Sequence, residues 1–172
     1  MNKNPRVAGM IGLLLAGCAT TALSDPSAEA ILQPTRGFDV RGSVMFKQAG
    51  DKVQVVAKVG GLTPGSHGFH IHEKGDCSAP DAMSAGGHFN PGGKPHGHPH
   101  QGEHHAGDMP MLEADSNGNA TLTTELPSIS IREGANSILG RSVIVHISPD
   151  DFKTQPTGNS GARMACGVIA AK

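Results

Sequence analysis

The chain has 172 residues, which is enough for one domain with a sizeable core. Its formal net charge of −1 and the lack of a basic patch argue against a nucleic-acid-binding protein. Aromatic residues make up only 3% of the chain and Trp and Tyr are absent, so the core must consist of aliphatic side chains and Met. The 24 glycines and 12 prolines favour many turns and short strands over long helices.

The first residues have the features of an export signal. Lys3 and Arg6 form a positively charged start, and the apolar stretch 8–16 is shorter than the ~20 residues that span a bilayer. This stretch ends in Leu15-Ala16-Gly17-Cys18, which resembles a bacterial lipobox, where the cysteine becomes the lipidated first residue. An ordinary signal peptide that is cut elsewhere, with Cys18 incidental, is the alternative.

The lipobox divides the chain into three predicted segments: a signal peptide at 1–17, a lipidated tether at 18–29 and a folded domain at 30–172. Export and lipidation at Cys18 predict a periplasmic protein of the cell envelope that is anchored to a membrane through its N-terminal lipid.

Alternation of apolar and polar residues predicts a series of short strands. These strands are expected at 30–33, 40–46, 53–59, 67–73, 119–126, 142–147 and 167–171. Turn residues predict a hairpin turn at 48–51 and a second turn at 115–118. Two long loops remain, at about 74–108 and 148–163, and structureless loops of this length in compact domains are usually functional.

Histidine is the compositional anomaly, because nine of the ten histidines lie from His67 to His105. A histidine-rich tract indicates metal binding. His70 and His72 are two residues apart in a predicted strand, so their side chains project from the same face. Imidazole suits copper and zinc, and His146 ends another predicted strand that could bring it to the same point.

A second group of ligand residues follows within the first long loop. It supplies three imidazoles and one carboxylate, from His88, His96, His105 and Asp108. Four ligands of these types form a closed tetrahedral site that is typical of structural zinc. The sequence therefore predicts two metal sites, one built on strands and one built within a loop.

The chain has three cysteines, and Cys77 and Cys166 remain once Cys18 is assigned to the lipid. Disulfides persist in exported proteins, so we expect these two residues to pair. Two buried free thiols are the alternative. Metal ligation is disfavoured because neither cysteine has a partner at CxxC spacing.

These motifs together resemble bacterial copper,zinc superoxide dismutases. The segments that carry the resemblance are Gly68–Glu73, Gly87–Pro91, His105–Asp108, Gly140–His146 and Gly161–Ile169. The resemblance extends from about Ala30 to the C-terminus. It implies an all-β fold, an eight-stranded antiparallel Greek-key barrel or sandwich with two long functional loops.

The resemblance also implies an oxidoreductase activity and its cofactors. Superoxide would be converted to molecular oxygen and hydrogen peroxide by alternating reduction and oxidation of copper, which would protect the cell envelope. By matching position, one copper ion per subunit would be held by His70, His72, His88 and His146. One zinc ion would be held by His88, His96, His105 and Asp108.

Other matching positions imply further roles. His88 would bridge the two metals and take up a proton, and Arg163 would line the substrate channel, so both are expected to be catalytic. Asp150 matches a carboxylate that hydrogen-bonds a ligand histidine of each site. Cys77 and Cys166 match the family's intrasubunit disulfide. Family members occur as homodimers and as monomers, and both remain open for this chain.

Four histidines fall outside this ligand set. His98, His100 and His104 are extra loop residues, which are either solvated or able to capture scarce metal. Only the family spacing favours His96 and His105 over these neighbours as ligands. His67 is interpreted as a structural, hydrogen-bonding residue. The main alternative function is a non-catalytic periplasmic copper/zinc-binding module, which would need neither His146 nor Arg163.

Overall fold

The computed structural model describes Met1 and residues 25–172. All of the predicted signal peptide after Met1, Cys18 and most of the predicted tether lie outside the described residues. The first strand, β1 (Ser27–Pro34), begins within the last part of the predicted tether, so ordered sheet structure starts before Ala30. Among the described residues, no helix is long and apolar enough to cross a membrane.

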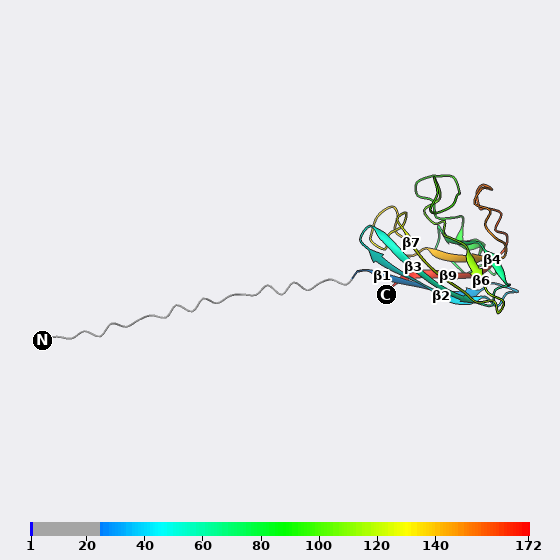
Figure 1. Cartoon of the computed structure of the whole chain (residues 1–172), viewed down its shortest axis with the longest axis horizontal. Coiled ribbons are helices and arrows are strands. Elements are labelled where there is room, and N and C mark those ends of the chain that lie inside the picture. The colour runs from blue at the N-terminus through cyan, green and yellow to red at the C-terminus, as the bar shows by residue number, and fades with distance from the viewer. Residues whose placement is uncertain (2–24) are drawn as a thin grey trace.

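The described residues form an all-β fold, as predicted, with nine strand segments in two antiparallel sheets (Figure 1). A curled seven-stranded sheet has the order β5-β8-β9-β1-β2-β3-β7. Besides β1 it contains β2 (Arg41–Ala49), β3 (Lys52–Gly60), β5 (Phe69–His72), β7 (Ala120–Leu126), β8 (Ser142–His146) and β9 (Arg163–Ala171). A small second sheet pairs β4 (Gly65–His67) with β6 (Leu112–Ala114).

The small sheet connects the two edges of the large one. β4 is separated from edge strand β5 by Gly68 alone, and β6 leads through the turn at 115–118 into the other edge strand, β7. The predicted turn is confirmed by a hydrogen bond from the Gly118 N–H to the Asp115 carbonyl, 3.0 Å. The two sheets therefore close around one core, as in a barrel or sandwich.

Three strands differ from the sequence prediction. The predicted strand 67–73 is divided at Gly68, whose N–H and carbonyl bond to Ser148 and His146 instead of continuing one ladder. A side chain at Gly68 would clash with the Ser160 hydroxyl. β6 was not predicted, because its three residues are too few to show alternation. β9 begins at Arg163, earlier than predicted, because Met164, Ala165 and Cys166 are all buried and mask the period of two.

β5 and β8 are buried on both faces, and this places the histidines. Phe69 and Ile71 of β5 join the main core with Val143 and Val145 of β8. The outer face is covered by the first long loop, and there Ile144 packs with Ala82, Ala85 and Cys166 in a separate apolar cluster. Side chains that alternate outward from these strands are therefore shielded from solvent.

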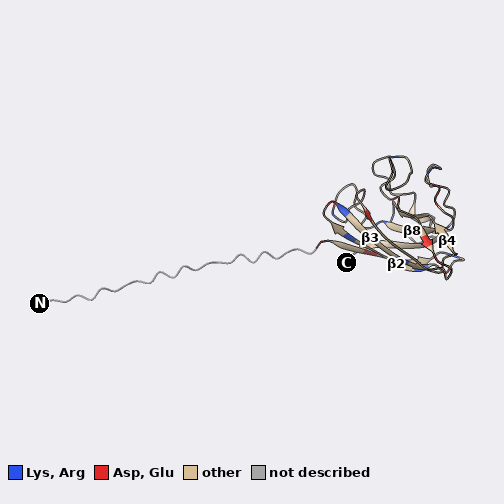
Figure 2. Ribbon diagram, in the orientation of Figure 1, with Lys and Arg blue, Asp and Glu red and all other residues tan. Residues whose placement is uncertain are grey.

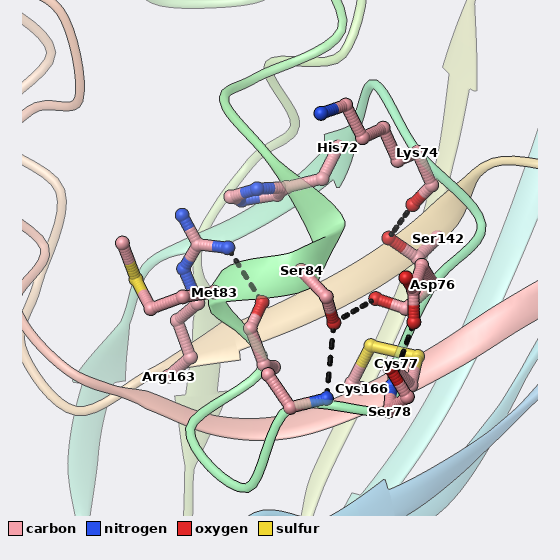
Figure 3. The surroundings of a disulfide bond; sticks show 12 residues. His72, Lys74, Asp76, Cys77, Ser78, Met83, Ser84, Ser142, Arg163 and Cys166 are labelled. Carbon is pink, nitrogen blue, oxygen red and sulfur yellow. Dashed lines mark hydrogen bonds between the residues drawn. A yellow bond between two sulfur atoms is a disulfide. The ribbon is translucent and has the colours of Figure 1, made fainter.

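Cys77 and Cys166 form the expected disulfide, with Cα atoms 5.8 Å apart (Figure 3). The alternative of two free thiols is thereby excluded. The bond joins the first long loop to β9 across 89 residues, and on the disputed chain-entropy model a loop of that length contributes ~4–5 kcal/mol. Ser142 of β8 adds a second tie, since its hydroxyl donates to the Lys74 carbonyl at 2.7 Å.

Charged residues are mixed along the strands (Figure 2). The ion pairs among them are exposed, such as Lys52–Glu125 at 3.6 Å between β3 and β7. Exposed pairs of this kind contribute ~0–1 kcal/mol, so apolar burial and the disulfide dominate the stability of the fold. The two long loops lie on the same side of the large sheet (Figure 1).

Candidate metal centre

Four histidines meet on the outer face of β5 and β8, and we call this group the strand cluster. Its members are His70, His72, His88 and His146, which are all buried, and one ligand atom of each lies within 4.8 Å of the others. His70 and His72 alternate outward from β5, as predicted. His146 ends β8 next to a shift in the β8–β9 register, and such irregularities re-aim side chains at sites.

A second group, the loop cluster, consists of His88, His96, His105 and Asp108, again buried and within the same distance limit. His88 belongs to both groups. Asp108 Oδ1 lies 3.0 Å from Nδ1 of His88, 3.0 Å from Nδ1 of His96 and 3.5 Å from Nδ1 of His105. The other oxygen, Oδ2, accepts the backbone N–H groups of Gly97 and His105, which fixes the orientation of the carboxylate.

The loop reaches the strand histidines because its backbone attaches to β5. Ile71 donates its N–H to the Gly107 carbonyl and accepts the N–H of Phe89, both at 2.8 Å. The Glu73 N–H donates to the Gly87 carbonyl at 2.9 Å. His88 lies between Gly87 and Phe89, and Asp108 directly follows Gly107. Backbone pairing with β5 therefore sets the position of both side chains.

The hydrogen bonds of the strand cluster fix the tautomers of its rings. His72 Nδ1–H donates to the Gly86 carbonyl at 2.9 Å, and His146 Nδ1–H donates to the Gly161 carbonyl at 3.2 Å. His70 Nε2–H donates to Asp150 Oδ2 at 2.7 Å. A neutral ring that donates through one nitrogen presents a lone pair on the other, which is the atom that a metal requires.

The remaining nitrogens of these rings have no hydrogen-bond partner among residues 25–172. They are His70 Nδ1, His72 Nε2, His88 Nε2 and His146 Nε2, and all four are buried. Leaving a buried polar atom unpaired costs ~1–3 kcal/mol. Four such atoms that face one point are suited to hold a metal ion. This donor set therefore fits a metal of the kind that the sequence implies.

Asp150 connects the two clusters. Besides His70, its carboxylate accepts His96 Nε2–H, with Oδ1 at 2.9 Å, and it also accepts the Phe152 N–H at 2.8 Å. A side chain at Gly158, whose φ is +63°, would clash with both Asp150 Oδ1 and His96 Nε2. One carboxylate from the second long loop therefore orients a histidine of each group, and this is the role that the family resemblance implies for Asp150.

Burial and neighbouring charges set the protonation of the centre. Burial lowers the pKa of His70, His72 and His146, and it lowers the pKa of His88 to about 4, so these rings are neutral at neutral pH. Burial also opposes the charge of His96, but hydrogen bonds to Asp108 and Asp150 outweigh it and raise the pKa of His96 to about 9. The region between these carboxylates thus favours a cation.

A pocket of about 350 Å³ reaches the strand cluster, and its lining includes His72, His146 and Arg163. Arg163 begins β9, and its guanidinium donates to the Ala82 and Gly86 carbonyls, both at 2.7 Å. Figure 3 shows Arg163 close to His72 and Met83, and the disulfide joins the same loop to β9. Arg163 is half-buried, so it presents a fixed positive charge inside the pocket.

The other histidines lie outside both clusters. His67 hydrogen-bonds with the His146 carbonyl through Nδ1 and with the Thr63 carbonyl through Nε2, in agreement with a structural role. His98, His100 and His104 lie at or near the surface. Sequence reasoning missed the carbonyls of Gly86 and Gly161, which orient His72 and His146, and the only signal for them was a glycine at each position.

Comparisons with known proteins agree with this geometry. The family described as Copper/zinc superoxide dismutase (SODC) matches residues 40–169. A protein named Superoxide dismutase [Cu-Zn] 2 from Brassica juncea is 43% identical over 147 residues, which cover 81% of this chain and 94% of the relative. The crystal structure of the clock protein EA4 is 39% identical with a TM-score of 0.77, covering 87% of this chain and 96% of the other. The chain therefore belongs to the copper/zinc superoxide dismutase family, whose enzymes convert superoxide to molecular oxygen and hydrogen peroxide.

Proposed function

We propose that the strand cluster holds the copper ion and the loop cluster holds the zinc ion of this dismutase, with His88 shared between them. The observation that carries the proposal is the set of four buried nitrogens that have no partner among residues 25–172, two of which belong to His72 and His146 in the lining of the Arg163 pocket. The loop cluster has the closed set of three imidazoles and one carboxylate that is typical of structural zinc. The strand cluster offers imidazole alone and adjoins the pocket, which suits a redox-active metal.

Each part of the chain then has a role in dismutation. Copper, when bound, would supply the one-electron acceptor and donor that two superoxide ions need in turn. Arg163 attracts the anion and positions it, because the Ala82 and Gly86 carbonyls fix the guanidinium beside His72 and His146. His88 Nε2 holds or releases a proton as the charge of the centre changes. Asp150 keeps His70 and His96 in the orientation and tautomer that metal binding requires.

The rival function is a non-catalytic copper/zinc-binding module with the same clusters. Such a module needs metal ligands but no substrate path. The pocket that joins Arg163 to His72 and His146 favours the enzyme, because a half-buried cation beside two ligand histidines serves an anionic substrate.

We further propose that the protein is a bacterial lipoprotein of the cell envelope, cut before Cys18 and anchored in the periplasm by its lipid, with 18–29 mainly a tether. Support comes from the charged and apolar start of the chain and from Leu15-Ala16-Gly17-Cys18. The Cys77–Cys166 disulfide fits such a location, since disulfides persist in the bacterial periplasm and are rare in the cytosol.

We also propose that the enzyme is a homodimer. Three large aliphatic side chains that are 52%, 37% and 42% exposed lie close together on the outer surface, namely Ile31, Leu139 and Val168. They are neighbours because Ala30 pairs with Ile169, and the Gly140 N–H donates to the Ile169 carbonyl. A self-complementary apolar patch suits a twofold interface between copies of one chain.

Replacing Asp150 with Asn should weaken binding of both metals, because a neutral amide accepts the hydrogen bonds of His70 and His96 less strongly than the carboxylate does. Loss of such a partner typically costs ~10–100-fold in metal affinity, which competition with chromophoric chelators can measure. Asp151→Asn makes the same chemical change in the same loop, at an exposed residue whose carboxylate accepts from Lys153 and Thr154 and not from a histidine of either cluster. Equal losses in the two variants would contradict the role of Asp150.

A dismutase assay on protein loaded with copper and zinc tests the function. Arg163→Glu should lower kcat/KM by ~10–1000-fold and weaken its dependence on ionic strength, because the attraction for the anion is reversed. Arg132→Glu makes the same charge change at an exposed residue outside the pocket lining and should have little effect. His146→Ala should abolish activity. Fully loaded wild-type protein without activity would favour the binding module.

Expression in a bacterium with labelled palmitate tests the anchor. The wild-type protein should carry the label and sediment with membranes, whereas Cys18→Ser should carry none and appear in the soluble periplasmic fraction. Label on the Cys18→Ser variant, or its absence from the wild type, would contradict lipidation at this residue.

Analytical ultracentrifugation of the domain without residues 1–24 tests the dimer. The wild type should sediment as a dimer, and Val168→Lys should sediment as a monomer because it places a charge in the patch. Met83→Lys changes another exposed apolar residue away from the patch and should stay dimeric. A monomeric wild type would refute the interface.

A further inference from the structure

Three histidines that neither cluster uses lie within one short segment of the first long loop. His98 and His104 are half-buried and His100 is exposed. The segment is bounded by two members of the loop cluster, since His98 comes two residues after His96 and His104 comes directly before His105. Both loop-cluster residues are nearly inaccessible, with 3% and 5% exposure, so a metal ion must pass protein atoms to reach them.

The spacing of these rings resembles that of rings in the buried clusters. The ring centroids of His98 and His100 are 5.9 Å apart. The corresponding distance is 5.5 Å for His96 and His105, and 5.6 Å for His72 and His146. Two imidazoles at this separation can hold one cation between them after small side-chain rotations. His104 lies in the same segment, four residues after His100.

Each of the three rings retains a nitrogen for a ligand. The contacts within residues 25–172 use Nδ1 of His98, Nε2 of His100 and Nδ1 of His104, which bond to the His100 N–H, the Thr124 hydroxyl and the Gly102 carbonyl at 3.1–3.2 Å. These bonds are at the surface, where water can replace them at little cost. Glu103 is directed elsewhere, since it pairs with Lys94.

The position of His98 is fixed by the second long loop. Its ring packs against the Phe152 ring with the centroids 4.7 Å apart. The backbone N–H of Phe152 donates a hydrogen bond to the carboxylate of Asp150, and this carboxylate orients His96. His98 is thus linked through Phe152 to the carboxylate that connects the two clusters.

We propose that His98, His100 and His104 form a solvent-facing, weaker zinc site that supplies the loop cluster. Imidazoles suit zinc, and a weak outer site raises the local zinc concentration at the loop that must move to admit the ion. A tether of a few residues gives an effective concentration on the order of millimolar, far above scarce free zinc. The supply role rests on the proposed zinc role of the loop cluster, whereas binding at the outer site does not.

Zinc titration of the metal-loaded protein tests the outer site. Wild-type protein should bind one further zinc ion that dialysis against a weak chelator removes, and the H98Q/H100Q/H104Q variant should not bind it. The Q101A/E103Q variant changes the same segment without an imidazole and should behave as wild type. No further zinc in the wild type, or equal extra zinc in the triple variant, would overturn the proposal.

Zinc uptake by the metal-free protein tests the supply role separately. Followed with a chromophoric zinc indicator at limiting zinc, uptake by the triple variant should be several-fold slower, with the same final amount of tightly held zinc. Equal uptake rates would overturn the supply role. If the loop cluster itself does not bind zinc, the wild type and the variants alike would lack tightly held zinc. The removable zinc ion at the outer site would still be detected in the wild type, so this result differs from a failure of the supply role.

Discussion

Four buried imidazole nitrogens that face one another, with no hydrogen-bond partner among residues 25–172, impose the main constraint on this structure. Each unpaired atom costs ~1–3 kcal/mol, and four lone pairs directed at one point also repel. The surrounding fold must offset this cost whenever no cation neutralises it. The nitrogens cannot turn to water instead, because β5 and β8 are buried on both faces and the loop that covers them is joined covalently to β9.

The two long loops order each other around this centre. Gln155 of the second loop donates from Nε2 to the His96 carbonyl at 2.9 Å and accepts the His96 N–H at 2.8 Å. Asp150 of the same loop accepts from the His96 ring. His96 is therefore held at its backbone and its side chain by a segment more than 50 residues away in sequence. The first loop has only the short 3-10 helix η1 (Met83–Ala85) and single bridges to β5, and the second has neither helix nor strand, so metal ligands and these contacts largely replace secondary structure.

Much of the fold could be predicted from the sequence, because alternation and turn residues are local signals, whereas the site residues are inferred from ligand types, their spacing and the family resemblance. Alternation placed His70 and His72 on one face, and the structure brings them together with His88 and His146. The division of the predicted strand at Gly68 could not be predicted, because it depends on Ser148 and Ser160 from a distant loop. The carbonyls that fix the tautomers of His72 and His146 were also hidden, since any residue has one.

The disulfide between Cys77 and Cys166 helps to fix the position of Arg163, although Arg163 is not part of it. Arg163 is three residues before Cys166 on β9, and the carbonyls that hold its guanidinium belong to the loop that begins near Cys77. The disulfide thus joins both sides of this contact. Without it, the loop could move away and release the guanidinium, together with His88 and the Gly86 carbonyl that orients His72, while His70, His72 and His146 would stay on β5 and β8. The disulfide therefore acts on the substrate path and on the metal ligands together, because the loop that it holds supplies His88 as well as the carbonyls that fix Arg163 and His72.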